Sequence, residues 1–147
     1  MPPVAISTRA TTEATAAAAR TTTTATPRRK ILVVDDESDI NLTLKLALEE
    51  YGFEVEVFDS ALLALDNFRK GLYDLAILDI KMPVMNGFEL YREIKRIDPK
   101  LKVCFLTAGE MYSGNYGDIL DHNQFIRKPI ENAELLKRIN EIITKSV

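Results

Sequence analysis

From Lys30 to its end, the chain alternates short apolar segments with segments of helical periodicity. The apolar runs, rich in β-branched residues, predict strands at Ile31–Val34, Phe53–Phe58, Leu75–Leu78, Val103–Leu106 and Gln124–Arg127. Three of these runs are almost continuously apolar, which is typical of parallel strands that are covered on both faces. Because crossovers between parallel strands are right-handed and place helices on both sides, this alternation predicts an α/β fold with an open, doubly wound parallel sheet.

The segments between the strands carry apolar residues at helical spacing. Their predicted inward faces are Ile40, Leu44, Ala47, Leu48 and Tyr51 in the first, Ala61, Leu65 and Phe68 in the second, Leu90, Ile94 and Ile97 in the third, and Leu135, Ile139 and Ile142 in the last. Gly52 and Gly71 are predicted to end the first two helices. Ser60 is predicted to cap the second. The third should follow the Asn86-Gly87 turn and close before Pro99.

The stretch between the fourth and fifth strands breaks this pattern. Residues 109–123 include Gly109, Gly114 and Gly117, two asparagines and only weak apolar spacing. Each glycine inside a helix costs about 1 kcal/mol relative to alanine. We therefore expect a short or irregular fourth helix there.

Composition separates the first 29 residues from the rest of the chain. Of these residues 17 are Thr or Ala, and almost none is large and apolar, so the segment cannot offset the entropy lost on ordering. Residues 1–30 carry a net charge of +4, whereas residues 31–147 carry −7. We predict a disordered Thr/Ala-rich tail over 1–29 and one folded domain over 30–147. An organelle transit peptide has a similar composition and is the alternative for the tail.

Four of the five predicted strands lead into polar functional groups. Asp35 and Asp36 follow the first strand, Asp79 the third, Thr107 the fourth and Lys128 the fifth. Ligands of such sheets bind beyond the carboxyl ends of the strands, so the fold should bring these residues together. Like charges about 4 Å apart repel by roughly 4 kcal/mol at an effective dielectric of 20, so clustered carboxylates need a cation. Oxygen ligands with open positions for water favour Mg²⁺.

Such a set of side chains is suited to phosphoryl transfer. A carboxylate held beside Mg²⁺, a lysine and a hydroxyl can attack phosphorus, because the reaction mainly demands positioning and neutralisation of charge on the phosphoryl oxygens. The product would be an acyl phosphate on the attacking aspartate. The Thr107 hydroxyl can hydrogen-bond a phosphoryl oxygen.

The same motifs resemble those of the response-regulator receiver family over residues 30–147. The residues that carry the resemblance are Val33-Val34-Asp35-Asp36, Asp79-Ile80-Lys81-Met82-Pro83 with Asn86-Gly87, Thr107-Ala108, and Phe125-Ile126-Arg127-Lys128-Pro129. The resemblance implies a flavodoxin-like sheet of five parallel strands in the order 2-1-3-4-5. It also implies a phosphoprotein of two-component signalling, similar to the stand-alone chemotaxis response regulators.

The resemblance implies a role for each residue of the acidic site. Asp79 is expected to be the phosphoacceptor. Asp36 is expected to bind Mg²⁺ directly and Asp35 largely through water, while Lys81 contributes its backbone carbonyl. Lys128 is expected to pair with the carboxylates and then with the phosphoryl group.

The resemblance also implies a conformational switch. The Thr107 hydroxyl, next to Ala108, is expected to move to the phosphoryl group while the Phe125 ring turns inward behind it. In this family the peptide bond before the proline that matches Pro129 is usually cis.

The expected partners follow from the resemblance as well. They are a histidine kinase or His-phosphotransfer protein and an unknown downstream protein. The face built from the fourth helix, fifth strand and last helix, where this family often dimerises, is compatible with a homodimer. Because only 19 residues follow Lys128, we expect a stand-alone regulator that acts by contact. The apolar runs are too short to cross a bilayer and the basic run Arg28–Lys30 is short, so we expect a cytoplasmic protein without membrane or direct nucleic-acid binding.

Two other functions share parts of this pattern. A phosphatase of the haloacid-dehalogenase type needs a second aspartate two residues after the nucleophile, and that position here is Lys81. We therefore expect no enzyme activity beyond Mg²⁺-dependent self-phosphorylation and dephosphorylation. The remaining alternative is a receiver-like interaction module that works without phosphorylation, although such modules usually lack some of the acidic or lysine positions that are present here.

Overall fold

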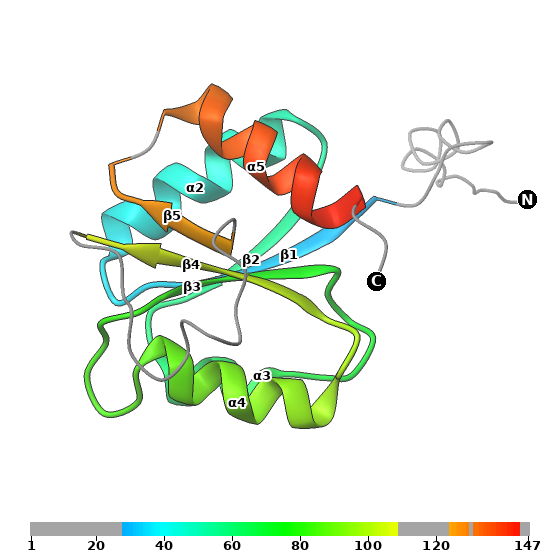
Figure 1. The fold of residues 1–147 in the computed structure, drawn as a ribbon. Helices are drawn as coiled ribbons and strands as arrows, with labels where there is room; N and C mark the ends of the chain where they lie inside the picture. Colours follow the sequence, from blue (N-terminus) through cyan, green and yellow to red (C-terminus); the bar gives the residue numbers. More distant parts are fainter. Residues whose placement is uncertain (1–27, 109–123, 130, 145–147) are drawn as a thin grey trace, which may run out of the picture.

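The computed structural model describes residues 28–108, 124–129 and 131–144, which form an α/β domain (Figure 1). The strands are β1 (Lys30–Val34), β2 (Glu54–Phe58), β3 (Leu75–Asp79), β4 (Lys102–Thr107) and β5 (Phe125–Arg127). The helices are α2 (Ser38–Glu50), α3 (Ala61–Asn67), α4 (Gly87–Ile97) and α5 (Asn132–Thr144). All strand pairs are parallel and their order is β2-β1-β3-β4-β5, so the predicted fold class and strand order are confirmed.

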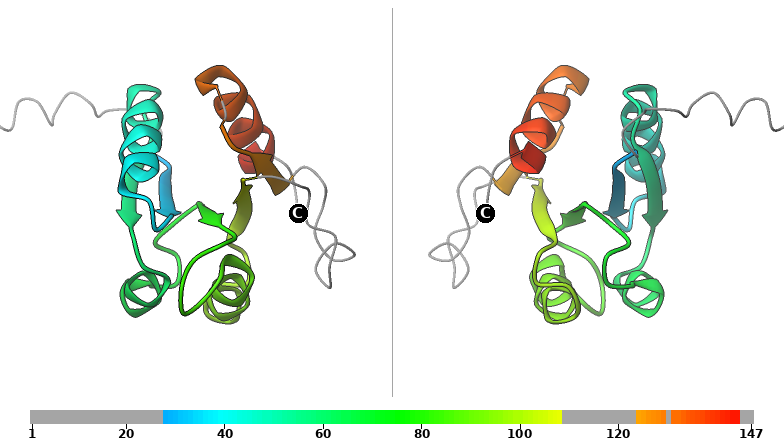
Figure 2. Two further views of the ribbon diagram at one scale, coloured as in Figure 1. Left: turned by 90° about the vertical axis from the view of Figure 1, so that its left-hand side faces the viewer. Right: turned by 90° about the vertical axis from the view of Figure 1, so that its right-hand side faces the viewer.

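The sheet lies between two helical layers. Helices α2 and α5 cover one face and α3 and α4 cover the other (Figures 1 and 2). Alternate residues of each inner strand face opposite layers: Leu32 and Val34 pack toward α3 and α4, whereas Ile31 and Val33 pack toward α2 and α5. Because both faces are covered, every residue of β3 is buried, which explains the continuous apolar runs in the sequence.

Side-chain and backbone caps fix the helix ends beside the strands. Ser60 accepts a hydrogen bond from the backbone of Leu63 at 3.3 Å and caps α3, as predicted. Gly52 follows α2 with a φ of 98°, a conformation that glycine adopts without steric cost. Asn86 caps α4, and Glu89 returns a bond to the Asn86 backbone, which completes a capping box.

Two of the predicted inward residues are exposed, and a third is buried but lies outside its helix. Tyr51 is 51% exposed because α2 ends at Glu50, so its side chain no longer follows the helical face. Ile97 is 39% exposed at the last turn of α4. Phe68 is buried as predicted, but α3 has already ended and Phe68 has an extended backbone.

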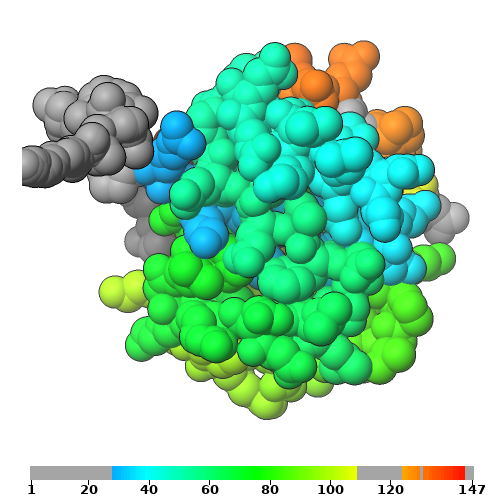
Figure 3. Space-filling view, turned by 180° about the vertical axis from the view of Figure 1, so that it is seen from behind, coloured from blue at the N-terminus to red at the C-terminus, as the bar shows by residue number. Residues whose placement is uncertain are grey.

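The edge strand β2 and its flanking helices form one continuous face (Figure 3). Lys45 of α2 donates a hydrogen bond to the carbonyl of Val55 at 3.0 Å, which occupies one of the acceptors of this edge strand. Four leucine side chains of α2 and α3 are exposed: Leu42, Leu46, Leu62 and Leu63.

Two of the sequence predictions lie outside the described residues. They are the disordered tail, apart from residues 28 and 29, and the short or irregular fourth helix over 109–123. The carbonyl of Arg29 accepts a hydrogen bond from the Glu54 backbone at 2.9 Å, so this residue already contacts the sheet. Within the described ranges, no helix combines the length and the apolar composition that crossing a membrane requires.

Candidate functional site

The carboxyl ends of the strands bring the predicted polar residues to one edge of the sheet. Backbone hydrogen bonds continue past the strand ends and fix the loops there. Asp35 N–H donates to the carbonyl of Phe58 at 3.2 Å, and Lys128 N–H donates to the carbonyl of Thr107 at 2.8 Å. The loops that carry the site are therefore held by the same ladder that holds the sheet.

Three carboxylates meet at this edge. Asp35, Asp36 and Asp79 each offer an oxygen atom, and these atoms lie within 4.8 Å of one another. Asp35 and Asp79 are buried whereas Asp36 is exposed. The cluster is therefore closed to solvent at Asp35 and Asp79 and open to solvent at Asp36.

Lys128 is the positive charge in this cluster. Its Nζ lies 2.9 Å from Asp35 Oδ2 and 3.2 Å from Asp79 Oδ1. Its side chain is only 14% exposed, and those of Asp35 and Asp79 are 0% and 7% exposed, so water screens these two pairs poorly. Asp35 Oδ2 is buried and has this ion pair but no well-directed hydrogen bond among the described residues.

The pKa values of the buried pair reflect this environment. Burial, together with the negative charge of Asp35, raises the pKa of Asp79 to about 6, and Lys128 only partly opposes the shift. Burial by itself lowers the pKa of Lys128, but its close contacts and charge interactions with Asp35 and Asp79 outweigh burial and raise it. The carboxylate cluster is thus short of positive charge, which is the condition that favours a bound cation.

Two residues that the sequence did not single out support the cluster. Glu37 donates its backbone N–H to Asp35 Oδ1 at 2.9 Å, and its carboxylate lies 3.4 Å from Lys128 Nζ. Asn41, which is buried, donates its amide to the carbonyl of Asp35 at 2.7 Å. The sequence carried a signal for each: Glu37 extends the acidic pair after β1, and Asn41 is a polar residue on the apolar face of α2.

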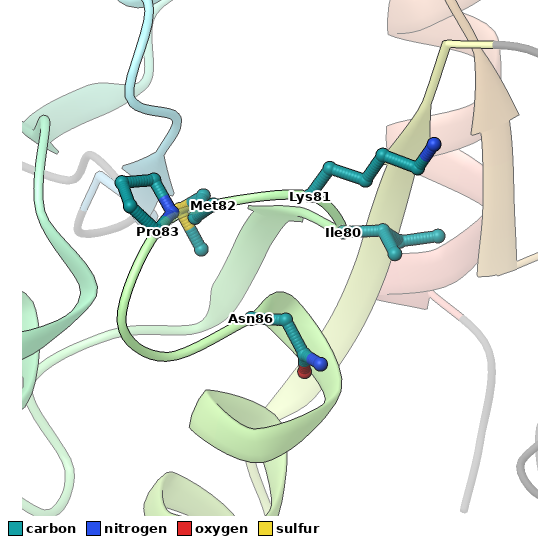
Figure 4. Close-up of a pocket in the computed structure, with 5 residues that line it drawn as sticks. All are labelled: Ile80, Lys81, Met82, Pro83 and Asn86. Atoms are coloured by element: carbon teal, nitrogen blue, oxygen red, sulfur yellow. The ribbon is translucent and has the colours of Figure 1, made fainter.

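The loop after β3 forms an open cavity beside the cluster. The cavity has a volume of about 400 Å³ and is lined by Ile80, Lys81, Met82, Pro83 and Asn86 (Figure 4). In this view Ile80 and Lys81 extend to one side of the loop, and Met82 and Pro83 lie on the other. Lys81 lies two residues after Asp79, and the expected contribution of its backbone carbonyl stays a prediction.

The predicted switch residues lie on or directly after β4, which pairs with β3, and on β5, which pairs with β4. Thr107 is buried at the end of β4 and Ala108, directly after it, is exposed. Phe125 is 6% exposed, and its ring stacks on that of Phe105 with centroids 5.6 Å apart. The Lys128-Pro129 peptide bond is cis, as the resemblance implied.

The arrangement matches a known family. Residues 31–140 match the family described as response regulator receiver domain. The chain belongs to the response-regulator receiver family. Solved receivers have the same fold: the non-phosphorylated HemR receiver domain from Leptospira biflexa has a TM-score of 0.71 and 29% sequence identity, covering 82% of this chain and 98% of that one. A CheY-like receiver domain protein from Methanospirillum hungatei JF-1 has a TM-score of 0.66 and 31% identity, covering 80% of this chain and 94% of that one.

Curated relatives of this receiver include regulators of different lengths. The transcriptional regulatory protein CreB of Escherichia coli K12 is 36% identical over 112 residues, which are 76% of this chain and 49% of CreB. The receiver thus spans about half the length of this relative. The response regulator receiver protein CpdR of Brucella abortus is 31% identical over 110 residues, which are 74% of this chain and 92% of CpdR.

Proposed function

We propose that this receiver is a phosphorylation-controlled switch of two-component signalling, with Asp79 as the phosphoacceptor. The phosphoryl group would come from a histidine kinase or a His-phosphotransfer protein. The observation that carries the proposal is the position of Lys128, whose ammonium lies 3.2 Å from Asp79 Oδ1 and 2.9 Å from Asp35 Oδ2 in a cluster of three carboxylates. A structural ion pair needs one acid, whereas this lysine is shared between buried acids that belong to two strand ends.

The residues of the cluster fit a Mg²⁺ ion. The donor set is made of carboxylate oxygens, which are the hard ligands that Mg²⁺ prefers, and the exposed side leaves room for water. The buried Asp35 Oδ2 without a well-directed hydrogen bond indicates that the cluster is short of partners. Asp35, Asp36, Asp79 and the backbone carbonyl of Lys81 would hold the ion, which would neutralise charge on phosphoryl oxygens when it is bound.

The chain's own residues would then carry the transfer. An oxygen lone pair of Asp79 forms the new O–P bond, and the electron pair of the P–N bond to the donor histidine returns to its ring nitrogen. Lys128 would balance the negative charge of the transferred group, and Thr107 would hydrogen-bond one of its oxygens. We propose no further catalytic activity, since Lys81 stands where a phosphatase of the haloacid-dehalogenase type has its general acid.

The expected output is a change in protein contacts. Phe125 already lies in the buried position, stacked on Phe105 and 6.3 Å from the ring centroid of Phe88 in α4. Phosphorylation would act through Thr107 and Ala108 on the face that carries Phe125. The downstream protein, a homodimer through this face, the stand-alone action, the cytoplasmic location and the lack of direct nucleic-acid binding stay predictions.

Intact mass spectrometry tests the proposal directly. The protein is incubated with Mg²⁺ and acetyl phosphate, and parallel samples contain EDTA or the Asp79→Asn variant. A mass gain of one HPO₃ that is lost in both controls supports the switch. Labelling that persists in Asp79→Asn would contradict the site, and folded protein that is never labelled would favour the phosphorylation-independent interaction module.

A further inference from the structure

Glu37 contacts Lys128 and Asp35 but is not one of the three clustered carboxylates. It occupies the N-cap position of α2, but its side chain makes no capping hydrogen bond. Its Oε1 instead lies 3.4 Å from Nζ of Lys128, which is 91 positions away in the sequence. Its backbone N–H donates to Asp35 Oδ1 at 2.9 Å. A side chain at an N-cap that turns from its own helix to a distant lysine suggests a role in the site.

Among the described residues, Lys128 has three acidic partners, which equals the number of N–H donors on its ammonium group. A lysine ammonium has three N–H donors and no acceptor. Lys128 Nζ lies within hydrogen-bonding or ion-pair distance of Asp35 at 2.9 Å, Asp79 at 3.2 Å and Glu37 at 3.4 Å. Before transfer, while Asp79 is still a carboxylate, an incoming phosphoryl oxygen that needs Lys128 must therefore take the place of one of these three acids.

Exposure decides which partner can leave. The side chains of Asp35 and Asp79 are 0% and 7% exposed, and each would remain buried without its countercharge. The Glu37 side chain is 64% exposed, so its carboxylate can turn into water. An exposed ion pair of this kind contributes little to stability and is broken at low cost.

We propose that Glu37 is a positioning residue, which holds the third donor of Lys128 in the unphosphorylated protein and competes with the phosphoryl group for it. This inference rests on the proposed phosphorylation of Asp79. Glu37 slows arrival of the phosphoryl group because its contact with Lys128 must be broken first. The isosteric, uncharged Glu37→Gln variant weakens that contact and leaves the carboxylate cluster in place.

The test compares rates of labelling by acetyl phosphate, measured by intact mass at saturating Mg²⁺. Glu37→Gln should be labelled about two- to fivefold faster than the wild type, the range that a partly exposed ion pair supports. Asp39→Asn is the matched control, because Asp39 is an exposed acid in the first turn of the same helix. It removes the same charge without a Lys128 contact and should change the rate less. In a Lys128→Ala background, Glu37→Gln should give no increase beyond that of Asp39→Asn.

Each other outcome counts against the inference. If the wild type is labelled and Glu37→Gln is labelled at the same rate, Glu37 does not compete for Lys128 and the proposed phosphorylation stands. If Asp39→Asn accelerates labelling as much as Glu37→Gln does, the cause is general repulsion between acidic residues and the anionic phosphodonor, not the contact between Glu37 and Lys128. The same conclusion follows if Glu37→Gln still accelerates labelling in the Lys128→Ala background. If the wild type is not labelled at all, the proposed function fails and this inference fails with it.

Discussion

Gly87, the first residue of α4, packs directly against the backbone carbonyl of Asp79. A Cβ atom at Gly87 would overlap that carbonyl oxygen and would lie 3.0 Å from Cα of Ile80. Gly87 N–H also donates to the carbonyl of Ile80 at 2.9 Å, so the helix start is fixed to the end of β3. The backbone that carries Asp79 thus packs against an element whose first residue has no room for a side chain.

Replacing Gly87 should therefore damage both stability and the site. We expect Gly87→Ala to lower the free energy of unfolding by about 1–3 kcal/mol, because the backbone of β3 or α4 must shift. It should also slow the labelling of Asp79. Urea unfolding and the mass assay measure the two effects. Gly71→Ala is the control, since Gly71 has a φ of +78° but nothing within 4 Å of an added Cβ, so the variant meets backbone strain without a clash.

If Gly87→Ala and Gly71→Ala lose equal stability and Gly87→Ala is labelled at the wild-type rate, the close packing of Gly87 against Asp79 is needed neither for stability nor for labelling.

The raised pKa of Asp79 predicts a pH-dependent penalty on folding in the absence of metal. Burial and the Asp35 charge raise this pKa from 3.8 to about 6, so the folded protein holds the proton more tightly than the unfolded chain does. The group therefore favours folding below about pH 4, and this contribution is lost as the pH rises through about 6. In EDTA at about pH 7.5, Asp79→Asn should be more stable than the wild type by up to about 3 kcal/mol.

Urea unfolding at several pH values measures this difference. It should shrink as the pH falls from about 6 to about 4 and approach zero only well below pH 3.8, where Asp79 is protonated in both states. A constant difference across the pH range would mean that Asp79 does not titrate near 6 in the metal-free protein.

Mg²⁺ should stabilise the folded receiver. A ligand that binds only the folded state adds about 1.4 kcal/mol at ten times its dissociation constant. We expect Mg²⁺ to raise the thermal unfolding midpoint of the wild type, and EDTA to reverse the shift. Asp36→Asn should lose most of the shift, because Asp36 offers one of the three clustered carboxylates. Asp39→Asn, an exposed acid outside the cluster, should keep it. If Mg²⁺ raises the thermal unfolding midpoint of Asp36→Asn and Asp39→Asn equally, the ion binds outside the carboxylate cluster.

Asn41 should matter for stability although its side chain is not among the clustered ligands. Its amide donates to the carbonyl of Asp35 at 2.7 Å and to that of Phe58 at 3.3 Å, joining the ends of β1 and β2. Asn41→Ala should cost about 1–3 kcal/mol, because buried carbonyls lose this donor. Asn67→Ala is the matched control, since Asn67 donates at 2.8 Å to a backbone carbonyl on the exposed surface. Denaturant unfolding should show a clearly smaller loss for the control, and similar losses would contradict this role.

The sequence determined the architecture because the relevant signals are local. The runs Ile31–Val34 and Leu75–Leu78 are apolar throughout, and a strand buried on both faces needs that pattern wherever it lies in the chain. Ser60 and Gly52 mark helix ends through contacts within a few residues. Local signals failed where a helix ended early: Tyr51 continues the apolar spacing of α2, but the helix has stopped before it.

The sequence also determined which residues meet, since parallel strands place all their carboxyl ends at one edge. That rule alone brought Asp35, Asp79 and Lys128 together. What only the tertiary structure decided is how they meet: which acids share Lys128, how deeply each is buried, and that Glu37 reaches the lysine from 91 positions away. Distances of this kind depend on loop paths and on packing between layers, which no periodicity in the sequence encodes. They also set how much water reaches each charge, and hence its pKa and its strength as a partner.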